Sequence, residues 1–322
     1  MPSPRCPQHP QSPLGSALFS TQDYFWGVDG EFTYAACPQC GSWILSPRPT
    51  PDEMGRYYAN YYPDTFLRRH RARCEKKALS QALGIDGARA KQSVRRLRRL
   101  GWRPDPAHRV LDIGCGLGGF LRGLKTWFGL SVRGVDFDPR CRDFVGQVHD
   151  VEVDVGELAD QEYPEAHFDL VTSWHCLEHT YAPTEELAEM ARITKHRGWL
   201  VLEVPTHGVL GRIFRGRWAF LQAPTHLFLL RPGALRALVD AAGFRVRRVE
   251  RPWLPAEWAA SVLTALGFKG FAPRLIYGDW RRSPQWFALF FLLLPFDLLL
   301  TLVLAIGGDS GVVRLYAQRE VS

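Results

Sequence analysis

From residue 109 onward, short apolar runs alternate with stretches whose polar and apolar residues follow a helical period. The runs are "RVLDIGCG" (109–116), "SVRGVDFD" (131–138), "HFDLVTSW" (167–174), "WLVLEVP" (199–205), "FRVRRVER" (244–251) and "VVRLYAQR" (312–319). Strands at this spacing, separated by helices, predict a doubly wound, mostly parallel α/β sheet. We therefore expect a Rossmann-like core over residues 109–251, with residues 311–322 supplying its final strand.

An almost continuous apolar stretch, Trp286–Ile306, lies in the insertion at 252–310. Its length suits a transmembrane helix, which needs about 20 residues. Strands of one sheet are expected before and after it, so a single crossing would leave the last strand on the wrong side of the bilayer. Pro295 and Asp297, near its middle, favour two short arms that form a hydrophobic hairpin dipping into one leaflet. Burial in a core or a dimer, and a true span, are the alternatives.

The first 48 residues contain two pairs of metal-binding residue types at tight-turn spacing. Cys6 and His9 form one pair, and Cys37 and Cys40 form the other. Four ligands of this type satisfy tetrahedral zinc and leave no open position, which is typical of structural sites. We predict a zinc-binding module over 1–48, and the alternative is two unrelated turns. The seven cysteines follow no regular spacing, so a disulfide scaffold is not indicated.

Residues 49–108 are predicted to be helical and strongly basic. The net charge of the chain is +7, yet the segment from Phe66 to Arg109 alone carries 11 Arg and 3 Lys against 3 acids. A solvated helix face explains this, and so does attraction to an anionic lipid or substrate. No aromatic and basic surface for reading nucleic acid accompanies the charge. The N-terminus lacks an apolar core, so we expect no secretory signal and a cytoplasmic location.

A glycine loop follows the first strand of the predicted core. Gly114, Gly116 and Gly118 match the turn used by S-adenosylmethionine methyltransferases, while Gly114, Gly116 and Gly119 match the dinucleotide fingerprint of dehydrogenases. Asp112, two residues before the loop, would repel a pyrophosphate but could bind the ammonium of a methionine moiety. The next strand ends in an acid that could accept two ribose hydroxyls. The pattern therefore predicts a nucleoside cofactor and favours S-adenosylmethionine over a nicotinamide.

The chain resembles class I S-adenosylmethionine-dependent methyltransferases that carry an N-terminal zinc-binding segment. The resemblance rests on the Cys-Pro-x-Cys-Gly turn and on "VLDIGCGLGGF", "GVDFDP", "FDLVTSWHCLEHTYAP", "GWLVLEVP" and "APTHLFLLRPGALRALVDAAGF", which follow one another over nearly the whole length. It implies the class I methyltransferase fold and cofactor. It also implies a cofactor site made of Asp112, Gly114, Gly116 and Gly118 near the methionine part, Asp136 at the ribose, Glu157 near the adenine, and Phe137, Gly156 and His175 beside them.

The sequence "SWHCLEHT" contains His175, Glu178 and His179 at the spacing of a zinc peptidase motif. Such a peptidase needs both histidines on a long helix, whereas here a loop and a short helix are expected at the carboxyl end of a strand. Three roles remain open: a general base, with His179 first and His226 second; a divalent-ion site; or a structural role.

These patterns together predict a membrane-associated methyltransferase. The expected acceptor is a hydroxyl of a glycan, a lipid-linked saccharide or a quinone-like molecule. The alternatives are an NAD(P)-dependent oxidoreductase and a non-catalytic, cofactor-binding scaffold at the membrane.

Overall fold

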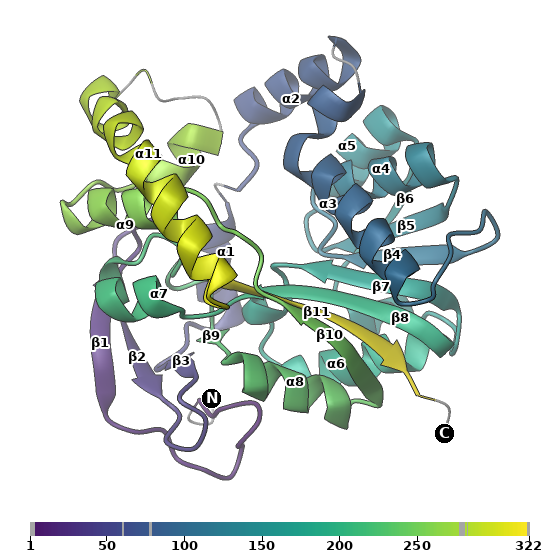
Figure 1. Ribbon diagram of the computed structural model, residues 1–322, viewed down its shortest axis with the longest axis horizontal. Helices are drawn as coiled ribbons and strands as arrows, with labels where there is room; N and C mark the ends of the chain where they lie inside the picture. Colours follow the sequence, from purple (N-terminus) through teal and green to yellow (C-terminus); the bar gives the residue numbers. More distant parts are fainter. Residues whose placement is uncertain (1–3, 60, 77–78, 277–280, 282, 321–322) are drawn as a thin grey trace.

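The computed structural model describes residues 4–59, 61–76, 79–276, 281 and 283–320. Its centre is a seven-stranded sheet with the order β10-β11-β8-β7-β4-β5-β6 (Figure 1). The strands are β4 (Arg109–Ile113), β5 (Ser131–Asp136), β6 (Glu152–Val155), β7 (Phe168–Trp174), β8 (Thr194–Pro205), β10 (Phe244–Glu250) and β11 (Val312–Arg319). All neighbouring pairs from β8 to β6 are parallel, and β11 is antiparallel to both β8 and β10. The predicted doubly wound, mostly parallel sheet is confirmed.

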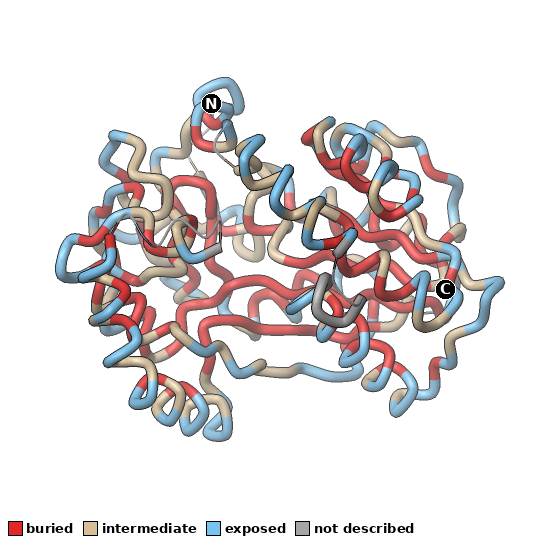
Figure 2. Tube along the Cα trace, turned by 90° about the horizontal axis from the view of Figure 1, so that it is seen from above, coloured by how far each residue is buried: buried red, intermediate tan, exposed pale blue. Residues whose placement is uncertain are grey.

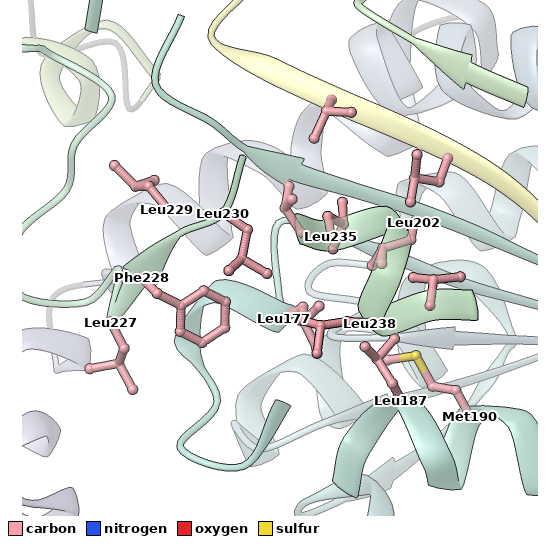
Figure 3. Close-up of a cluster of buried hydrophobic side chains, with 14 of the residues drawn as sticks. Leu177, Leu187, Met190, Leu202, Leu227, Phe228, Leu229, Leu230, Leu235 and Leu238 are labelled. Carbon is pink, nitrogen blue, oxygen red and sulfur yellow. The ribbon is translucent and has the colours of Figure 1, made fainter. Parts of the chain in front are cut away.

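Helices cover both faces of this sheet, because successive strand residues point to opposite sides. On one face, α3 (Leu79–Arg99) and α4 (Gly119–Phe128) pack with Leu170 and Val201. On the other face, α6 (Pro183–Ile193) and α8 (Pro232–Ala241) pack with Val171 and Leu202. Figure 3 shows the second cluster, in which the labelled side chains of α6, α8 and β8 point toward one another. The strands form the buried centre of the molecule (Figure 2).

The order in which successive strands are added to the sheet reverses at β4, which lies between β5 and β7. From β4 it proceeds through β5, α5 (Pro139–His149) and β6, and then returns to the other side of β4 to form β7. In open α/β sheets, ligands bind outside the carboxyl ends of the strands at such a switch point. This switch point carries the glycine loop and the "SWHCLEHT" segment.

A smaller antiparallel sheet has the order β1-β2-β3-β9. Three of its strands are N-terminal, namely β1 (Ala17–Gln22), β2 (Glu31–Ala36) and β3 (Trp43–Leu45), and β9 (Phe228–Leu229) comes from the segment between β8 and β10. Strand β2 is formed by the aromatic and small residues of "EFTYAA". Because β3 pairs with β9, the N-terminal residues and the α/β core share one sheet and one apolar cluster.

Two helices lie in the segment that connects the strands of the smaller sheet to the seven-stranded sheet. Helix α1 (Pro51–Tyr58) begins with a capping box, in which Thr50 and Glu53 exchange hydrogen bonds with each other's backbone N–H. Helix α2 (Asp64–Lys76) then leads to α3, as expected for the basic helical region. Short 3₁₀ turns, η1 (Leu158–Gln161), η2 (Leu177–His179) and η3 (Arg215–Arg217), follow β6, β7 and α7 (Val209–Phe214).

The predicted hydrophobic hairpin is wrong in its geometry. Residues Pro284–Ile306 form one continuous helix, α11, which passes through Pro295 without reversing. A proline removes one helical hydrogen bond but does not force a turn where neighbouring contacts hold the helix. Here α9 (Glu257–Ala265) and α10 (Phe271–Ile276) belong to the same apolar cluster as α11, and Asp297 hydrogen-bonds the start of α9. Among the described residues, α11 is the one helix long and apolar enough to cross a membrane.

Candidate functional site

The glycine loop makes its sharp turn through residues that need left-handed backbone angles. Gly114, Gly116 and Gly118 have φ values of 67°, 51° and 69°, a region that side chains with a Cβ rarely adopt. A Cβ at Gly114 would also lie 2.8 Å from Cys176 Sγ, so the loop after β7 packs directly against the glycine loop. These contacts bring two of the predicted functional segments together.

Asp136 braces the same loop from the end of β5. Its Oδ2 accepts a hydrogen bond from the Gly116 N–H at 2.9 Å, and its Oδ1 accepts one from the Asp138 N–H at 3.0 Å. The carbonyl of Asp136 also accepts a hydrogen bond from the N–H of Gly156 at 3.1 Å. Each carboxylate oxygen retains a lone pair, because a carboxylate offers about four acceptor positions. The geometry therefore fits the predicted role of Asp136 as a hydroxyl acceptor.

Asp112 lies deeper, at the end of β4, and is 2% exposed. Thr172 on β7 donates its hydroxyl to Asp112 Oδ1 at 2.6 Å. Burial, with the nearby carboxylates of Asp86 and Asp136, raises the pKa of Asp112 to about 8, against the effects of Thr172 and Arg89. A buried carboxylate with one neutral donor is suited to an additional cationic partner. This observation fits the ammonium of a methionine moiety.

The remaining predicted cofactor residues lie around these two carboxylates. Phe137, which follows Asp136, is 56% exposed, and its ring is 5.0 Å from the ring of Tyr58. Glu157 is exposed and immediately precedes the 3₁₀ turn after β6, next to Gly156. An exposed aromatic and an exposed acid beside the ribose acceptor are available to a planar base. The predicted cofactor-binding side chains Asp112, Asp136, Phe137 and Glu157 thus lie at or just beyond the carboxyl ends of β4, β5 and β6.

Three histidines surround the buried carboxylate of Glu178. Its Oε1 is 3.7 Å from His175 Nδ1, 4.0 Å from His179 Nε2 and 3.8 Å from His226 Nε2. Glu178 is 1% exposed, and neither of its oxygens has a hydrogen bond among the described residues. Glu178, His179 and His226 also place their ligand atoms within 4.8 Å of one another. The expected short turn, rather than a long peptidase helix, carries this cluster.

The three imidazoles differ in charge. Burial lowers the pKa of His175, but the nearby carboxylate of Glu178 and the hydrogen bond to Glu203 outweigh it and raise the pKa to about 9. Burial lowers the pKa of His179, opposed by the charge of Glu178, and burial together with His179 lowers that of His226 well below its ordinary value. At neutral pH, His175 is therefore an imidazolium between two carboxylates, while His179 and His226 are neutral.

The tautomer of His179 follows from its partners. Its Nδ1 is 2.8 Å from the Thr225 carbonyl oxygen, which only accepts, so Nδ1 carries the proton and Nε2 has a free lone pair. The hydroxyl of Tyr58 lies 3.0 Å from the same Nδ1. Sequence analysis missed both Thr225 and Tyr58. The aromatic run at 57–62 was a visible signal for Tyr58, whereas nothing local marked Thr225 as a partner of a residue 46 positions away.

Four predicted zinc ligands come together in the N-terminal module. Cys6 Sγ is 3.6 Å from Cys40 Sγ and 3.9 Å from His9 Nδ1, and Cys37 Sγ is 3.5 Å from His9 Nδ1. Tetrahedral zinc, with bonds of about 2.3 Å to sulfur and about 2.05 Å to nitrogen, requires separations of about 3.8 Å between sulfurs and about 3.6 Å between sulfur and nitrogen. The four side chains therefore fit a closed zinc site.

The turn that holds Cys37 and Cys40 is tied to the core. Gly41 accepts a hydrogen bond from His207 Nε2 at 3.0 Å, and the ring of His207 stacks on Trp43 at 4.1 Å. The hydroxyl of Tyr34 donates to the carbonyl of His226 at 2.7 Å. The N-terminal module therefore supports the histidine cluster directly.

Comparisons with known proteins agree with this geometry. Residues 85–249 match the family model described as "Methyltransferase domain", which covers just over half of the chain. The chain is 29% identical over 105 residues to ajmaline N-methyltransferase of Rauvolfia serpentina, covering 30% of this chain and 36% of that enzyme. It is 29% identical over 166 residues to a ubiquinone biosynthesis O-methyltransferase of Burkholderia vietnamiensis, covering 46% of this chain and 71% of the relative. The match thus spans about a third of one relative and under three quarters of the other.

Solved structures share the fold at low identity. Phosphoethanolamine N-methyltransferase 2 of Haemonchus contortus, in complex with S-adenosyl-L-methionine, aligns with a TM-score of 0.53 and 17% identity, covering 94% of this chain and 71% of that one. The [4+2]-cyclase SpnF aligns with a TM-score of 0.52 and 17% identity, covering 85% and 98%. The family match favours the methyltransferase interpretation of the glycine loop over the dehydrogenase one. The chain therefore belongs to the methyltransferase domain family and has the fold of the class I S-adenosylmethionine-dependent methyltransferases.

Proposed function

We propose that this enzyme methylates a hydroxyl oxygen of a small, lipophilic or lipid-linked acceptor, such as a glycan, a lipid-linked saccharide or a quinone-like molecule. One observation carries the proposal: a neutral histidine, His179, presents an unprotonated Nε2 at the edge of the sheet that holds the glycine loop. The similarity to ubiquinone biosynthesis O-methyltransferases supports transfer to oxygen.

When bound, S-adenosylmethionine supplies an electrophilic methyl group on a sulfonium. In our proposal Asp112 pairs with its ammonium, the glycine loop gives close backbone approach, and Asp136 accepts the ribose hydroxyls. Phe137 and Glu157 flank the adenine. The buried positions of Asp112 and Asp136 exclude water from the polar contacts and so strengthen them.

An acceptor hydroxyl must lose its proton as its oxygen takes the methyl group. His179 is the proposed base, because its pKa is lowered and its Nδ1 is anchored to Thr225, so that Nε2 can take the proton. Glu178, 4.0 Å from Nε2, would then stabilise the imidazolium that forms. His226 is 2% exposed and fits a supporting role better than direct contact with an acceptor.

A metal-assisted reaction is the second candidate. The two unpartnered oxygens of Glu178 and the neutral rings of His179 and His226 form a ligand set that suits a divalent cation. A cation there would orient the acceptor oxygen and lower its pKa, which makes a base dispensable. His175, as an imidazolium held by Glu203, is not a ligand in this arrangement.

Calorimetric titration with S-adenosylmethionine, and in parallel with NADH, tests the cofactor. Micromolar binding of the first that is lost in Asp136→Ala supports the proposal, whereas binding of NADH alone overturns it. An acceptor screen over membrane extracts follows, with the radiolabelled methyl group as the readout. His179→Gln should abolish turnover and leave cofactor binding intact, and His196→Gln, an exposed histidine on β8, is the matched control. Activity that depends on added Mg²⁺ or Mn²⁺ would favour the metal-assisted reaction.

We also propose that Cys6, His9, Cys37 and Cys40 hold a structural zinc, and that the enzyme works at the cytoplasmic face of a membrane. The separations of the four ligands support the first proposal. The apolar surface of α11 supports the second.

A further inference from the structure

Helix α11 is apolar on the side that faces away from the protein. Seven large side chains along it are between 41% and 79% exposed: Phe291, Leu292, Phe296, Leu299, Leu302, Val303 and Ile306. Helices on the surface of soluble proteins carry polar residues on this side. The exposed residues recur at helical spacing, with Leu292, Leu299 and Ile306 one above another at intervals of seven. We call these seven side chains the apolar face of α11.

The opposite side of the helix is fixed to the protein. Phe287 and Phe290 pack into an apolar cluster with α9 and α10, and Asp297 is fully buried. The carboxylate of Asp297 accepts hydrogen bonds from the N–H groups of Ala256, Trp258 and Ala259 at 2.6, 2.8 and 2.9 Å, and so caps the start of α9. A carboxylate at the centre of a bilayer is costly. Withdrawal of α11 to span a membrane would also leave these three N–H groups without their acceptor.

The topology places both ends of this insertion on one side of the sheet. Strands β10 and β11 are antiparallel neighbours, with Glu250 opposite Arg314. The chain therefore leaves β10 and re-enters β11 at the same edge, and a single crossing by α11 would separate two strands that are hydrogen-bonded. This arrangement excludes a span without unfolding the sheet and leaves α11 lying along a surface.

The charged residues near α11 indicate which kind of surface this helix could bind. Between residues 252 and 308, the described acids Glu257 and Asp297 are buried, whereas the described cations Lys269, Arg274 and Arg281 are at least partly exposed. Three further arginines are exposed, namely Arg212, Arg215 and Arg217. They lie on α7 and η3, which both pack against α9. Among the described residues of 209–217 and 252–310, every exposed charged side chain is a cation, and Asp309 is the one acid that is partly exposed. An apolar face with this surplus of exposed cations nearby is complementary to an anionic lipid surface.

We propose that α11 docks this enzyme in the plane of an anionic membrane, with its apolar face embedded in one leaflet. The docking side is also the side of the cofactor site, because Val312, the first residue of β11, pairs with Pro205 at the carboxyl end of β8. The glycine loop and the histidine cluster follow the carboxyl ends of β4 and β7 at the same edge. A lipophilic acceptor could then reach the site from the membrane. The inference deepens the membrane location proposed above and does not need the acceptor to be known.

Flotation of the purified full-length chain with lipid vesicles tests the proposal. Vesicles of phosphatidylcholine with 30% phosphatidylglycerol should carry the protein, and pure phosphatidylcholine should carry at least tenfold less. Leu292→Asp combined with Leu299→Asp should reduce binding to the anionic vesicles at least tenfold. Ile85→Asp, at a 71% exposed position on α3, is the matched control and should bind as the wild type does.

Folding of each variant is checked by its melting temperature and by titration with S-adenosylmethionine, both of which should match the wild type. If the double variant no longer binds vesicles but still binds the cofactor, the docking face is confirmed. If the wild type does not bind the cofactor at all, only the proposed function is refuted. If the double variant misfolds, Arg212→Glu with Arg215→Glu, which changes only exposed side chains, should lower anionic vesicle binding.

Two other outcomes overturn the inference. Wild-type binding by the double variant would exclude α11 as the docking element. The wild type could instead be a dimer that does not bind vesicles, while the double variant is a monomer. That result would show that a second copy of the chain covers the apolar face.

Discussion

Binding of S-adenosylmethionine should release a proton from Asp112. The carboxyl group of Asp112 has a pKa of about 8, so about nine in ten of these side chains are protonated at pH 7. An ammonium paired with Asp112 favours the carboxylate, and the proton must leave. The free amino group of the cofactor, with a pKa of about 7.8, takes up a small fraction of a proton in return. The net release is therefore about 1 proton per cofactor at pH 6, about 0.8 at pH 7 and near zero at pH 8.

Calorimetric titrations in buffers with different ionisation enthalpies measure this number. The slope of the observed enthalpy against the buffer enthalpy gives the protons exchanged per site. Asp112→Asn should abolish the release and weaken cofactor binding by about 10- to 100-fold, since a charged hydrogen bond contributes about 1.5–3 kcal/mol. A wild-type release near zero at pH 6, or an unchanged release in the Asn variant, would refute the assignment of Asp112.

The raised pKa of Asp112 also predicts how the free energy of unfolding of the cofactor-free protein depends on pH. The unfolded chain ionises Asp112 near its ordinary pKa of 3.8, whereas the folded chain holds the proton up to about pH 8. The folded state binds more protons in this window, so stability falls as pH rises, by about 4 kcal/mol between pH 4 and 7 from this group. Asp112→Asn should remove that contribution, so the variant should melt above the wild type at pH 8. Denaturation curves at several pH values check this.

Three further outcomes are expected. The acid limb of the kcat profile should lie below pH 6.5, because the pKa of His179 is lowered, and a limb at or above pH 6.5 would contradict a neutral base. Cys37→Ser should lose the roughly one zinc per chain that elemental analysis finds in the wild type, while Cys74→Ser, a buried cysteine outside the cluster, should retain it. Tyr34→Phe removes the hydrogen bond to the His226 carbonyl and should lower the free energy of unfolding by about 1–2 kcal/mol, read from denaturant midpoints; no change would mean that water replaces the hydroxyl.

The sequence by itself determined six of the seven strands of the main sheet, all but β6, and the glycine loop. Apolar runs and helical periods are local patterns, and each predicted strand from "RVLDIGCG" to "VVRLYAQR" forms in the structure. The three glycines have positive φ, a backbone requirement that is also local. Pairs of ligands at short spacing, such as Cys37 and Cys40, were recognisable for the same reason. Local stereochemistry restricts the neighbouring residues, so a short window of sequence contains the information.

Only the tertiary structure decided which distant groups meet. Glu178 gains His226, Thr225 orients His179, and Tyr58 arrives from α1, because packing of β9 and α1 against the core brings them there. The path of α11 was decided in the same way. Pro295 and Asp297 suggested a turn by their local preference, but the helix continues through both, and Asp297 caps α9 and so fastens α11 to it. Contacts between residues far apart in sequence depend on how whole elements pack, and no short window of sequence contains that information.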